Sequence, residues 1–458
     1  MKVHKKNIKL WLIALVGCGF ILASGLLLQK QLEGGKPELT FDLAAPYLSV
    51  SQTLAITVSD KESGVRRIWV GLVKDNKEVV LLEKDLPAAG VFGGGKVKQE
   101  TFRIKVEPRQ LGITDGKAIL RLVARDFAWR GWWHGNLTYI EKEISVDTRP
   151  PDVSILTRVH NISQGGAGLV VFKVSEPCSQ KGVYVGGTFF PGHSGYFHDP
   201  NTILAFFALN YKQGPETEIF VRATDYAGNN TRAGFPHYIK RKVFKRDSIN
   251  LSDRFLSWKM PEFDIDIPPD SKTPLVAKFL KVNRDLRQAN YRQITGVTEA
   301  TASEIYWAGA FLRLPRSARK SGYGEFRKYQ YKGSFIDQQV HMGIDLASVS
   351  QSPVPAANRG KVVFTENLGI YGKTVIIDHG FGLFSMYSHL SGFGVQEGQI
   401  VDRGTVIGQT GSTGFAAGDH LHFGVLVHNT FVNPIEWWDA AWIKNNITAK
   451  LEAVKFIN

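Results

Sequence analysis

The stretch His420-Leu421-His422-Phe423-Gly424-Val425-Leu426-Val427 decides the fold of the C-terminal part of this 458-residue chain. Successive side chains of a β-strand point to opposite faces, so this stretch has one polar and one apolar face. His420 and His422 share the polar face, and every second residue from Leu421 to Val427 is apolar. Two imidazoles about 7 Å apart along a strand can converge on one metal centre, or they can be two exposed histidines.

Further metal-ligating residue types lie nearby in the sequence. Six of the twelve histidines fall between residues 341 and 428, and Asp345 follows His341 by four positions. Hydrolytic zinc sites commonly take three protein ligands and leave a fourth position for water. His341, Asp345 and one of the paired histidines supply that number, although an isolated His-x-x-x-Asp pair also occurs often by chance.

Short motifs surround these histidines in a fixed order. They are Gly343-Ile344-Asp345-Leu346-Ala347, Pro353-Val354-Pro355-Ala356-Ala357, Gly360-Lys361-Val362-Val363, Tyr371-Gly372, His379-Gly380-Phe381-Gly382, Tyr387-Ser388-His389-Leu390, Gly411-Ser412-Thr413-Gly414, His420-Leu421-His422-Phe423 and Val432-Asn433-Pro434. In this order they closely resemble the lysostaphin-type (M23 family) zinc metallopeptidases. The resemblance implies an antiparallel β-sheet peptidase domain over residues 305–440.

The resemblance also implies roles for individual residues. His341, Asp345 and His422 would bind one Zn²⁺ per chain, while His389 and His420 would be catalytic histidines that do not bind the metal. We expect His420 to be the base and His389 the oxyanion donor, because a zinc-bound water needs a proton acceptor and the developing oxyanion needs a donor. Tyr371 is a candidate substrate-binding residue.

The activity implied is that of a zinc-dependent endopeptidase hydrolysing peptide bonds in bacterial peptidoglycan. The alternative is a catalytically silent M23-like regulator that activates another cell-wall hydrolase. Two departures from the family pattern affect substrate preference: Ser350-Gln351-Ser352 stands where a glycine is more usual, and the long interval from Phe311 to His341 contains the basic and aromatic run Arg327-Lys328-Tyr329-Gln330-Tyr331.

Two other histidines receive structural interpretations. His379 lies in a predicted hairpin turn with Gly380 and Gly382, and we predict a structural role for it. His428 is predicted to sit in solvent at the end of its strand.

The N-terminal residues 1–31 are predicted to be a cytoplasmic basic end and a membrane anchor. Four lysines precede an uncharged apolar run from Leu10 to Leu28, which is about long enough to cross a bilayer. This places the protein in the cell inner membrane as a single-pass protein, with the bulk of the chain in the periplasm or otherwise outside the cytoplasmic membrane. A cleaved signal peptide and a lipoprotein processing box at Leu15-Val16-Gly17-Cys18 are the alternatives.

The predicted partners follow from this location. Peptidoglycan and the membrane are expected, and envelope proteins remain unidentified. The formal net charge of +14 suits anionic partners in general, but export excludes nucleic acid.

The middle of the chain reads as mainly β. Two modules, 38–148 and 150–245, show short apolar runs broken by turn residues, and an Asp-aromatic-Ala turn follows a predicted strand in both. We predict immunoglobulin-like β-sandwiches that act as spacers or bind the wall. Residues 246–304 are predicted to be a linker with a helix near 277–286, and residues 441–458 a helical tail.

Overall fold

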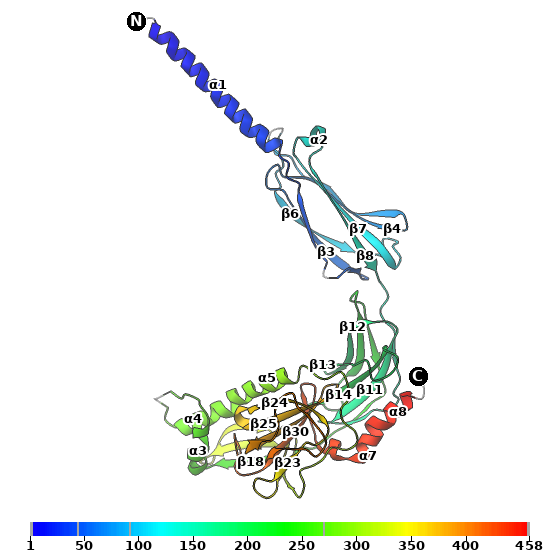
Figure 1. Cartoon of the computed structure of the whole chain (residues 1–458), viewed down its shortest axis with the longest axis vertical. Coiled ribbons are helices and arrows are strands. Elements are labelled where there is room, and N and C mark those ends of the chain that lie inside the picture. The colour runs from blue at the N-terminus through cyan, green and yellow to red at the C-terminus, as the bar shows by residue number, and fades with distance from the viewer. Residues whose placement is uncertain (1–2, 44, 91–92, 269–270, 456–458) are drawn as a thin grey trace. The chain divides into compact units, whose positions relative to one another are not determined.

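The computed structural model describes residues 3–43, 45–90, 93–268 and 271–455. Residues 1–2 of the predicted anchor and 456–458 of the predicted tail lie outside them. The chain forms two compact units, one of residues 1–150 with 224–229 and the other of residues 151–223 with 230–458 (Figure 1). The mainly-β character expected from the sequence is confirmed.

The first unit begins with helix α1, Val3–Gln31. Within the described residues, no helix meets the length and apolarity that a membrane crossing requires. The predicted membrane anchor is therefore unsupported.

Two sheets follow α1 in the first unit. One has the order β1-β3-β6 and the other β2-β8-β7-β4-β5. The strands are β1 (Glu38–Asp42), β2 (Tyr47–Leu48), β3 (Gln52–Ser59), β4 (Val65–Lys74), β5 (Lys77–Asp85), β6 (Gln99–Val106), β7 (Gly116–Asp126) and β8 (Leu137–Val146), with the short helix α2 (Arg130–Trp133) before β8. Every second residue of β7 is buried, as expected for a strand with one face against a core. The unit is thus a two-sheet sandwich around its own apolar core.

A second set of sheets opens the second unit. One sheet has the order β14-β11-β9, another β13-β12-β15-β16, and β10 pairs with β17. The strands are β9 (Val153–Ile155), β10 (Asn161–Ser163), β11 (Ala167–Val174), β12 (Cys178–Val185), β13 (Thr188–Pro191), β14 (Thr202–Ala208), β15 (Ile219–Asp225), β16 (Asn230–Gly234) and β17 (Tyr238–Lys240). Strand β14 is buried along its whole length. That burial is typical of a strand covered on both faces.

The segment after this module contains strand β18 (Arg246–Leu251) and several helices. These are α3 (Asp253–Lys259), η1 (Met260–Glu262), α4 (Pro274–Lys281), the π-helical turn η2 (Val282–Leu286) and α5 (Arg287–Val297). Helix α3 begins after Ser252, whose hydroxyl accepts a hydrogen bond from the Phe255 amide. Strand β18 pairs in parallel with β20, so the segment predicted as a linker is part of the C-terminal fold.

An eight-stranded sheet carries the candidate site. Its order is β19-β22-β30-β26-β25-β24-β28, and β31 also pairs with β30. The strands are β19 (Ala318–Ser321), β22 (Ile344–Ala347), β24 (Gly360–Asn367), β25 (Lys373–Gly380), β26 (Leu383–Leu390), β28 (Ile400–Val401), β30 (Leu421–Val427) and β31 (Thr430–Val432). Its pairings are antiparallel.

Two small sheets and a short helix flank the large sheet. One has the order β18-β20-β21, with β20 (Phe326–Tyr331) and β21 (Ser334–Val340). The other has the order β23-β29-β27, from β23 (Pro353–Pro355), β27 (Gly392–Phe393) and β29 (Val406–Gln409). The 3-10 helix η3 (Gly369–Tyr371) lies between β24 and β25.

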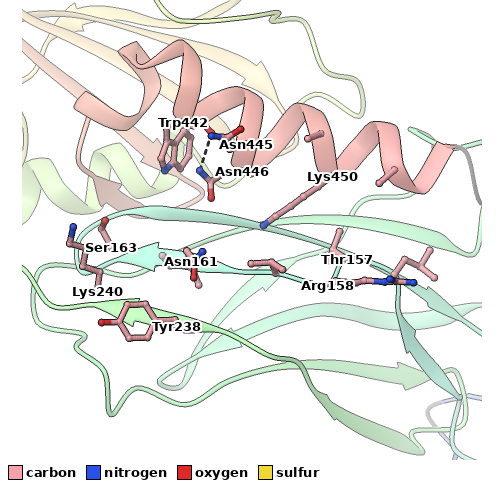
Figure 2. A pocket seen from close by; sticks show the side chains of 15 residues that line it. Thr157, Arg158, Asn161, Ser163, Tyr238, Lys240, Trp442, Asn445, Asn446 and Lys450 are labelled. Carbon is pink, nitrogen blue, oxygen red and sulfur yellow. Dashed lines mark hydrogen bonds between the residues drawn. The ribbon is translucent and has the colours of Figure 1, made fainter.

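The C-terminal helices join the large sheet of the second unit to its sandwich. They are α6 (Ile435–Trp438), α7 (Ala440–Ile443), the π-helical turn η4 (Lys444–Thr448) and α8 (Ala449–Lys455), and η4 and α8 pack against β11 (Figure 1). The Glu436 carboxylate accepts a hydrogen bond from the Ala167 amide at 2.9 Å. A cavity of about 950 Å³ remains between these helices and the sandwich, and Lys450 extends into it (Figure 2).

Candidate metal centre and active site

Three neighbouring strands of the large sheet bring the site residues together. Asp345 on β22 stands directly opposite His422 on β30, and Ser388 on β26 stands opposite His422 from the other side. Directly opposed residues of adjacent strands project to the same face of the sheet. A side chain at position 343 would collide with the His422 ring and the Phe423 carbonyl, so Gly343 permits the close approach that sets this register.

Three atoms of His341, Asp345 and His422 form a tight triangle. His341 Nε2, Asp345 Oδ1 and His422 Nδ1 each lie 2.9 Å from the other two. Tetrahedral ligands held about 2.0–2.1 Å from a metal are separated by roughly 3.3 Å, so the triangle is close to what one metal ion requires. These are the three residues expected from the sequence to bind zinc, and they form one of the candidate metal clusters among the described residues.

The protonation states of these side chains suit a metal. Burial would raise the pKa of the Asp345 carboxyl, but its contacts with His341 and His422 hold that pKa well below its usual range. Burial lowers the pKa of His422 to about 4. Metal ions bind ionised carboxylates and neutral imidazoles, so the donor set fits a zinc ion.

His389 reaches the site through an unusual backbone angle. It follows Ser388, and regular alternation along β26 would turn its side chain to the opposite face. Its φ is 62°, in the left-handed region, and its ring lies 5.8 Å from the His422 ring and 4.9 Å from the His420 ring. A non-glycine residue in that region costs about 1–2 kcal/mol. Such strain is often kept where it places a functional group.

His389 and His420 share one pattern of hydrogen bonds. His389 Nδ1 lies 2.8 Å from the Thr413 carbonyl, and His420 Nδ1 lies 2.8 Å from the Gly418 carbonyl. A carbonyl only accepts, so both Nδ1 atoms carry the proton and both Nε2 atoms carry a lone pair in the neutral rings. Burial, together with the neighbouring His420 and His422, holds the pKa of His389 well below its usual range. Both rings therefore present a proton acceptor, and His420 Nε2 lies 3.7 Å from Asp345 Oδ1.

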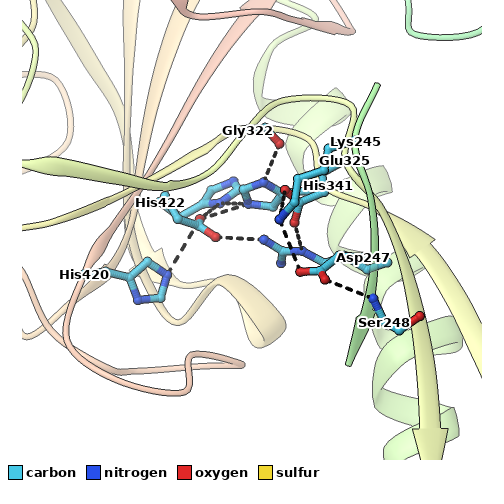
Figure 3. A network of polar contacts seen from close by, with 10 residues as sticks. Lys245, Asp247, Ser248, Gly322, Glu325, His341, His420 and His422 are labelled. Carbon is cyan, nitrogen blue, oxygen red and sulfur yellow. Dashed lines mark hydrogen bonds and ion pairs between the residues drawn. The ribbon is translucent and has the colours of Figure 1, made fainter. Parts of the chain in front are cut away.

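A network of ion pairs holds the second carboxylate oxygen of Asp345. Arg327 Nη2 donates to Asp345 Oδ2 at 2.9 Å, and Arg327 Nε lies 3.4 Å from the buried Glu325 (Figure 3). Lys245 lies 3.5 Å from Glu325 and from Asp247. Because Arg327 occupies Oδ2, Oδ1 is left to face His341 and His422. Such outer partners orient metal ligands.

The site opens into a cavity of about 400 Å³. Tyr371, predicted to bind substrate, lines it, and its ring lies 5.5 Å from that of His422. Its wall includes Arg327 and Tyr329, from the run that the sequence indicated would reshape the groove. Residues from the segment predicted as a linker also line it, and no sequence motif marked them: Asp247, Ile249, Asn250, Leu251, Phe255 and Arg287.

One contact fixes that segment to the site. Lys259 at the end of α3 is fully buried and donates to the Ser412 carbonyl at 2.7 Å and to Glu262 at 2.8 Å. Phe255, on the same helix, packs against Phe415 with ring centroids 5.9 Å apart. In the sequence, the motif Gly411-Ser412-Thr413-Gly414 marked one side of this contact, and no motif marked the other.

The two remaining histidines of the region lie away from the triangle. His379 is buried, with Nδ1 2.8 Å from the Arg359 carbonyl and Nε2 2.7 Å from the Ser385 hydroxyl, which agrees with the predicted structural role. The prediction for His428 is wrong. Its ring is buried and stacks on that of His193, because the chain turns sharply after β30 and folds it inward.

The sheet and the triangle are what a domain of the metallopeptidase class requires, with three side chains that could hold a metal ion lining a groove. Residues 339–434 match the model of Peptidase family M23, and this stretch is an M23 peptidase domain.

Similar proteins support that assignment. The chain is 41% identical over 97 residues to the DD-carboxypeptidase/endopeptidase Mpg of Neisseria meningitidis serogroup B, which covers 21% of this chain and 22% of that protein. It is 34% identical over 131 residues to the peptidoglycan DD-endopeptidase ShyB of Vibrio cholerae, which covers 28% of this chain and 30% of that protein. The alignments thus span less than a third of these relatives.

The catalytic domain of the antimicrobial peptidase lysostaphin from Staphylococcus simulans is 28% identical, and the match covers 29% of this chain and 98% of that domain with a TM-score of 0.25.

Proposed function

We propose that this protein is a zinc-dependent endopeptidase that hydrolyses peptide bonds in bacterial peptidoglycan. The observation that carries the proposal is the convergence of His341 Nε2, Asp345 Oδ1 and His422 Nδ1 within 2.9 Å of one another, beside two histidines with Nε2 lone pairs. The names of the similar Neisseria and Vibrio proteins support the substrate class. Peptidoglycan lies outside the cytoplasmic membrane, so the proposal includes an exported peptidase domain.

The chain's own residues define the chemistry. His341, Asp345 and His422 would hold the zinc ion, which when bound acidifies a water molecule and polarises the scissile carbonyl. His420, whose Nδ1 proton is committed to the Gly418 carbonyl, accepts a proton at Nε2 as the general base.

His389 needs one further step to act as the oxyanion donor. In its neutral form Nε2 is an acceptor, because the proton on Nδ1 is directed at the Thr413 carbonyl. It donates from Nε2 only when it, and not His420, receives the single proton that the attacking water gives up. His389 and His420 therefore form a pair in which the role of each depends on which one holds the proton.

The experiment that tests this function is the release of soluble peptides from purified peptidoglycan. We expect the full chain to release peptides that mass spectrometry assigns to one type of cleaved amide bond. The His420→Ala variant should release them at least about 100-fold more slowly, because a positioned general base contributes roughly 10²–10⁴-fold. His237→Ala, which removes an exposed histidine outside the site, is the matched control.

The outcomes separate the proposed enzyme from its alternative. Zinc bound by the full chain without release of any peptide would contradict the enzyme and favour a silent regulator of another cell-wall hydrolase. Equal release by the full chain and His420→Ala would show that the histidine site does not perform the reaction.

A further inference from the structure

One cation in the wall of the active-site cavity has no acidic partner among the described residues. The other charged side chains that line the cavity are paired: Arg327 with Asp345 and Glu325, and Asp247 with Lys245. Arg287, the first residue of α5, is held only by Asn283, through its carbonyl at 3.2 Å and its side-chain oxygen at 2.8 Å. These bonds use Nε and Nη2, and Nη1 makes no hydrogen bond within the described part of the chain.

The support beneath Arg287 is rigid. Asn283 is fully buried, and its amide donates to Asp337 at 2.8 Å. Its carbonyl also accepts a hydrogen bond from Gln339 at 2.9 Å. A guanidinium fixed in this way loses little conformational entropy when it binds a ligand.

Helix α5, which carries Arg287, packs against η3, which carries Tyr371. Asn290, one turn further along α5, accepts a hydrogen bond from the Ile370 amide at 2.9 Å, which packs α5 against η3. Tyr371 follows Ile370, and its ring lies 5.5 Å from that of His422. Burial raises the pKa of Tyr371, and the positive charge of Arg287 opposes that rise.

Apolar side chains also line the cavity, among them Ile249, Phe255, Ile370 and Phe415. A charge pair is stronger in such surroundings than in water. We propose that Arg287 forms a subsite for a carboxylate that the peptide substrate carries close to its scissile bond. This inference rests on the proposed function and narrows the substrate class to anionic peptides.

A carboxylate can come from the C-terminus of the peptide or from a side chain. The test therefore uses three synthetic cross-linked stem peptides: one with all carboxylates free, one amidated at the C-terminus and one amidated at the side-chain carboxylates. Cleavage by the full chain is measured as kcat/KM, and binding of the same peptides is measured by calorimetry.

We expect the full chain to prefer the free peptide over one of the amidated peptides by about 10- to 100-fold, the usual effect of a hydrogen bond to a charged group. Arg287→Gln should remove that preference while it cleaves the amidated peptide within about threefold of the full chain. Arg287→Lys should retain part of the preference, because it keeps the charge and loses the planar fork. Arg292→Gln, at an exposed position on the same helix, should behave like the full chain.

The results distinguish the subsite from the function. Three outcomes would overturn the subsite and leave the endopeptidase intact. The full chain could show no preference for the free peptide. Arg287→Gln could keep that preference, or it could slow cleavage of all three peptides equally. A full chain that cleaves no peptide would overturn the endopeptidase. The subsite would then be tested by calorimetry: it is supported if the full chain binds the free peptide more tightly and Arg287→Gln does not, and overturned otherwise.

Discussion

His389 depends on a single backbone angle for its place in the site. Its left-handed φ turns the ring toward His420 and His422, whereas the regular strand would bury it on the other face. The three residues of the triangle need no such distortion, because Asp345 and His422 are cross-strand neighbours. The proposed metal ligation and the proposed catalysis should therefore be separable at the level of single residues.

Asp345→Ala and His389→Ala test this separation. Asp345→Ala should reduce bound zinc from about one ion per chain to almost none, since only two protein ligands remain. His389→Ala should keep its zinc and lose turnover by roughly 10²–10⁴-fold. Metal analysis and peptidoglycan digestion of the same preparations check both, and equal loss of metal in the two variants would contradict the assigned roles.

The resemblance to the M23 family predicted which side chains meet at the triangle. Alternation along His420-Leu421-His422 placed the two histidines on one strand face but did not choose between them. The residues around His389 in the sequence did not indicate its left-handed φ. The burial of His428 was missed because a histidine at a strand end is usually solvated, and its stacking on His193 depends on residues more than 200 positions earlier.

At the scale of elements, the hairpin of β25 and β26 needs a glycine where it meets the segment before it. Gly380 has a φ of 90°, and a Cβ there would lie 1.7 Å from the Glu304 carbonyl oxygen. Residues 302–306 lie against the edge of the hairpin. There the Phe381 amide donates to the Ala302 carbonyl, and the Tyr306 amide donates to the His379 carbonyl.

Gly380→Ala should therefore destabilise the protein by more than the cost of placing an alanine at a positive φ, because its Cβ would also collide with the Glu304 carbonyl. Gly398→Ala is the control, because Gly398 has a similar φ of 86° and open space around it. We expect Gly398→Ala to lower the free energy of unfolding by about 1–2 kcal/mol, and Gly380→Ala to lower it by about 1–3 kcal/mol more. Urea unfolding measures both, and equal losses would show that residues 302–306 yield without cost.

For the segment from β18 to α5, the sequence predicted a helix but not how the segment packs. Its helical spacing near residues 277–286 was visible, and α4 and η2 occupy that region. Its position was not visible, because the parallel pairing of β18 with β20 joins strands about 80 residues apart and depends on no motif. The part of the cavity wall that this segment supplies, including Arg287, was missed for this reason.

At the scale of the second unit, Glu436 joins the peptidase side to the sandwich. Its carboxylate is buried against the Ala167 amide, and burial raises its pKa to about 7. In the unfolded chain it releases its proton near its ordinary value of about 4.5. The folded state thus holds a proton that the unfolded state has lost between these values, and stability falls as the pH rises from about 4.5 to 7.

Glu436→Gln should remove this loss, since the amide oxygen still accepts from Ala167 and carries no charge. We expect the variant to match the parent near pH 4.5 and to be more stable by on the order of 3 kcal/mol at pH 8. Thermal and urea unfolding across this range measure the difference. Glu452→Gln, on an exposed face of α8, should keep the parent's pH dependence. The same profile for both variants would contradict the account of Glu436.

One apolar core runs through the whole second unit, from Ile162 and Phe206 in the sandwich to Trp437 and Val454 near the C-terminus. Ring contacts of Phe206 with Trp307 and Trp437 lie inside it. A sandwich built into the core in this way is not a detachable lid, because lifting it would expose these rings to water. A fragment meant to keep this core intact should therefore begin near residue 151, since a boundary at the edge of the M23 match would cut through the hydrophobic interior.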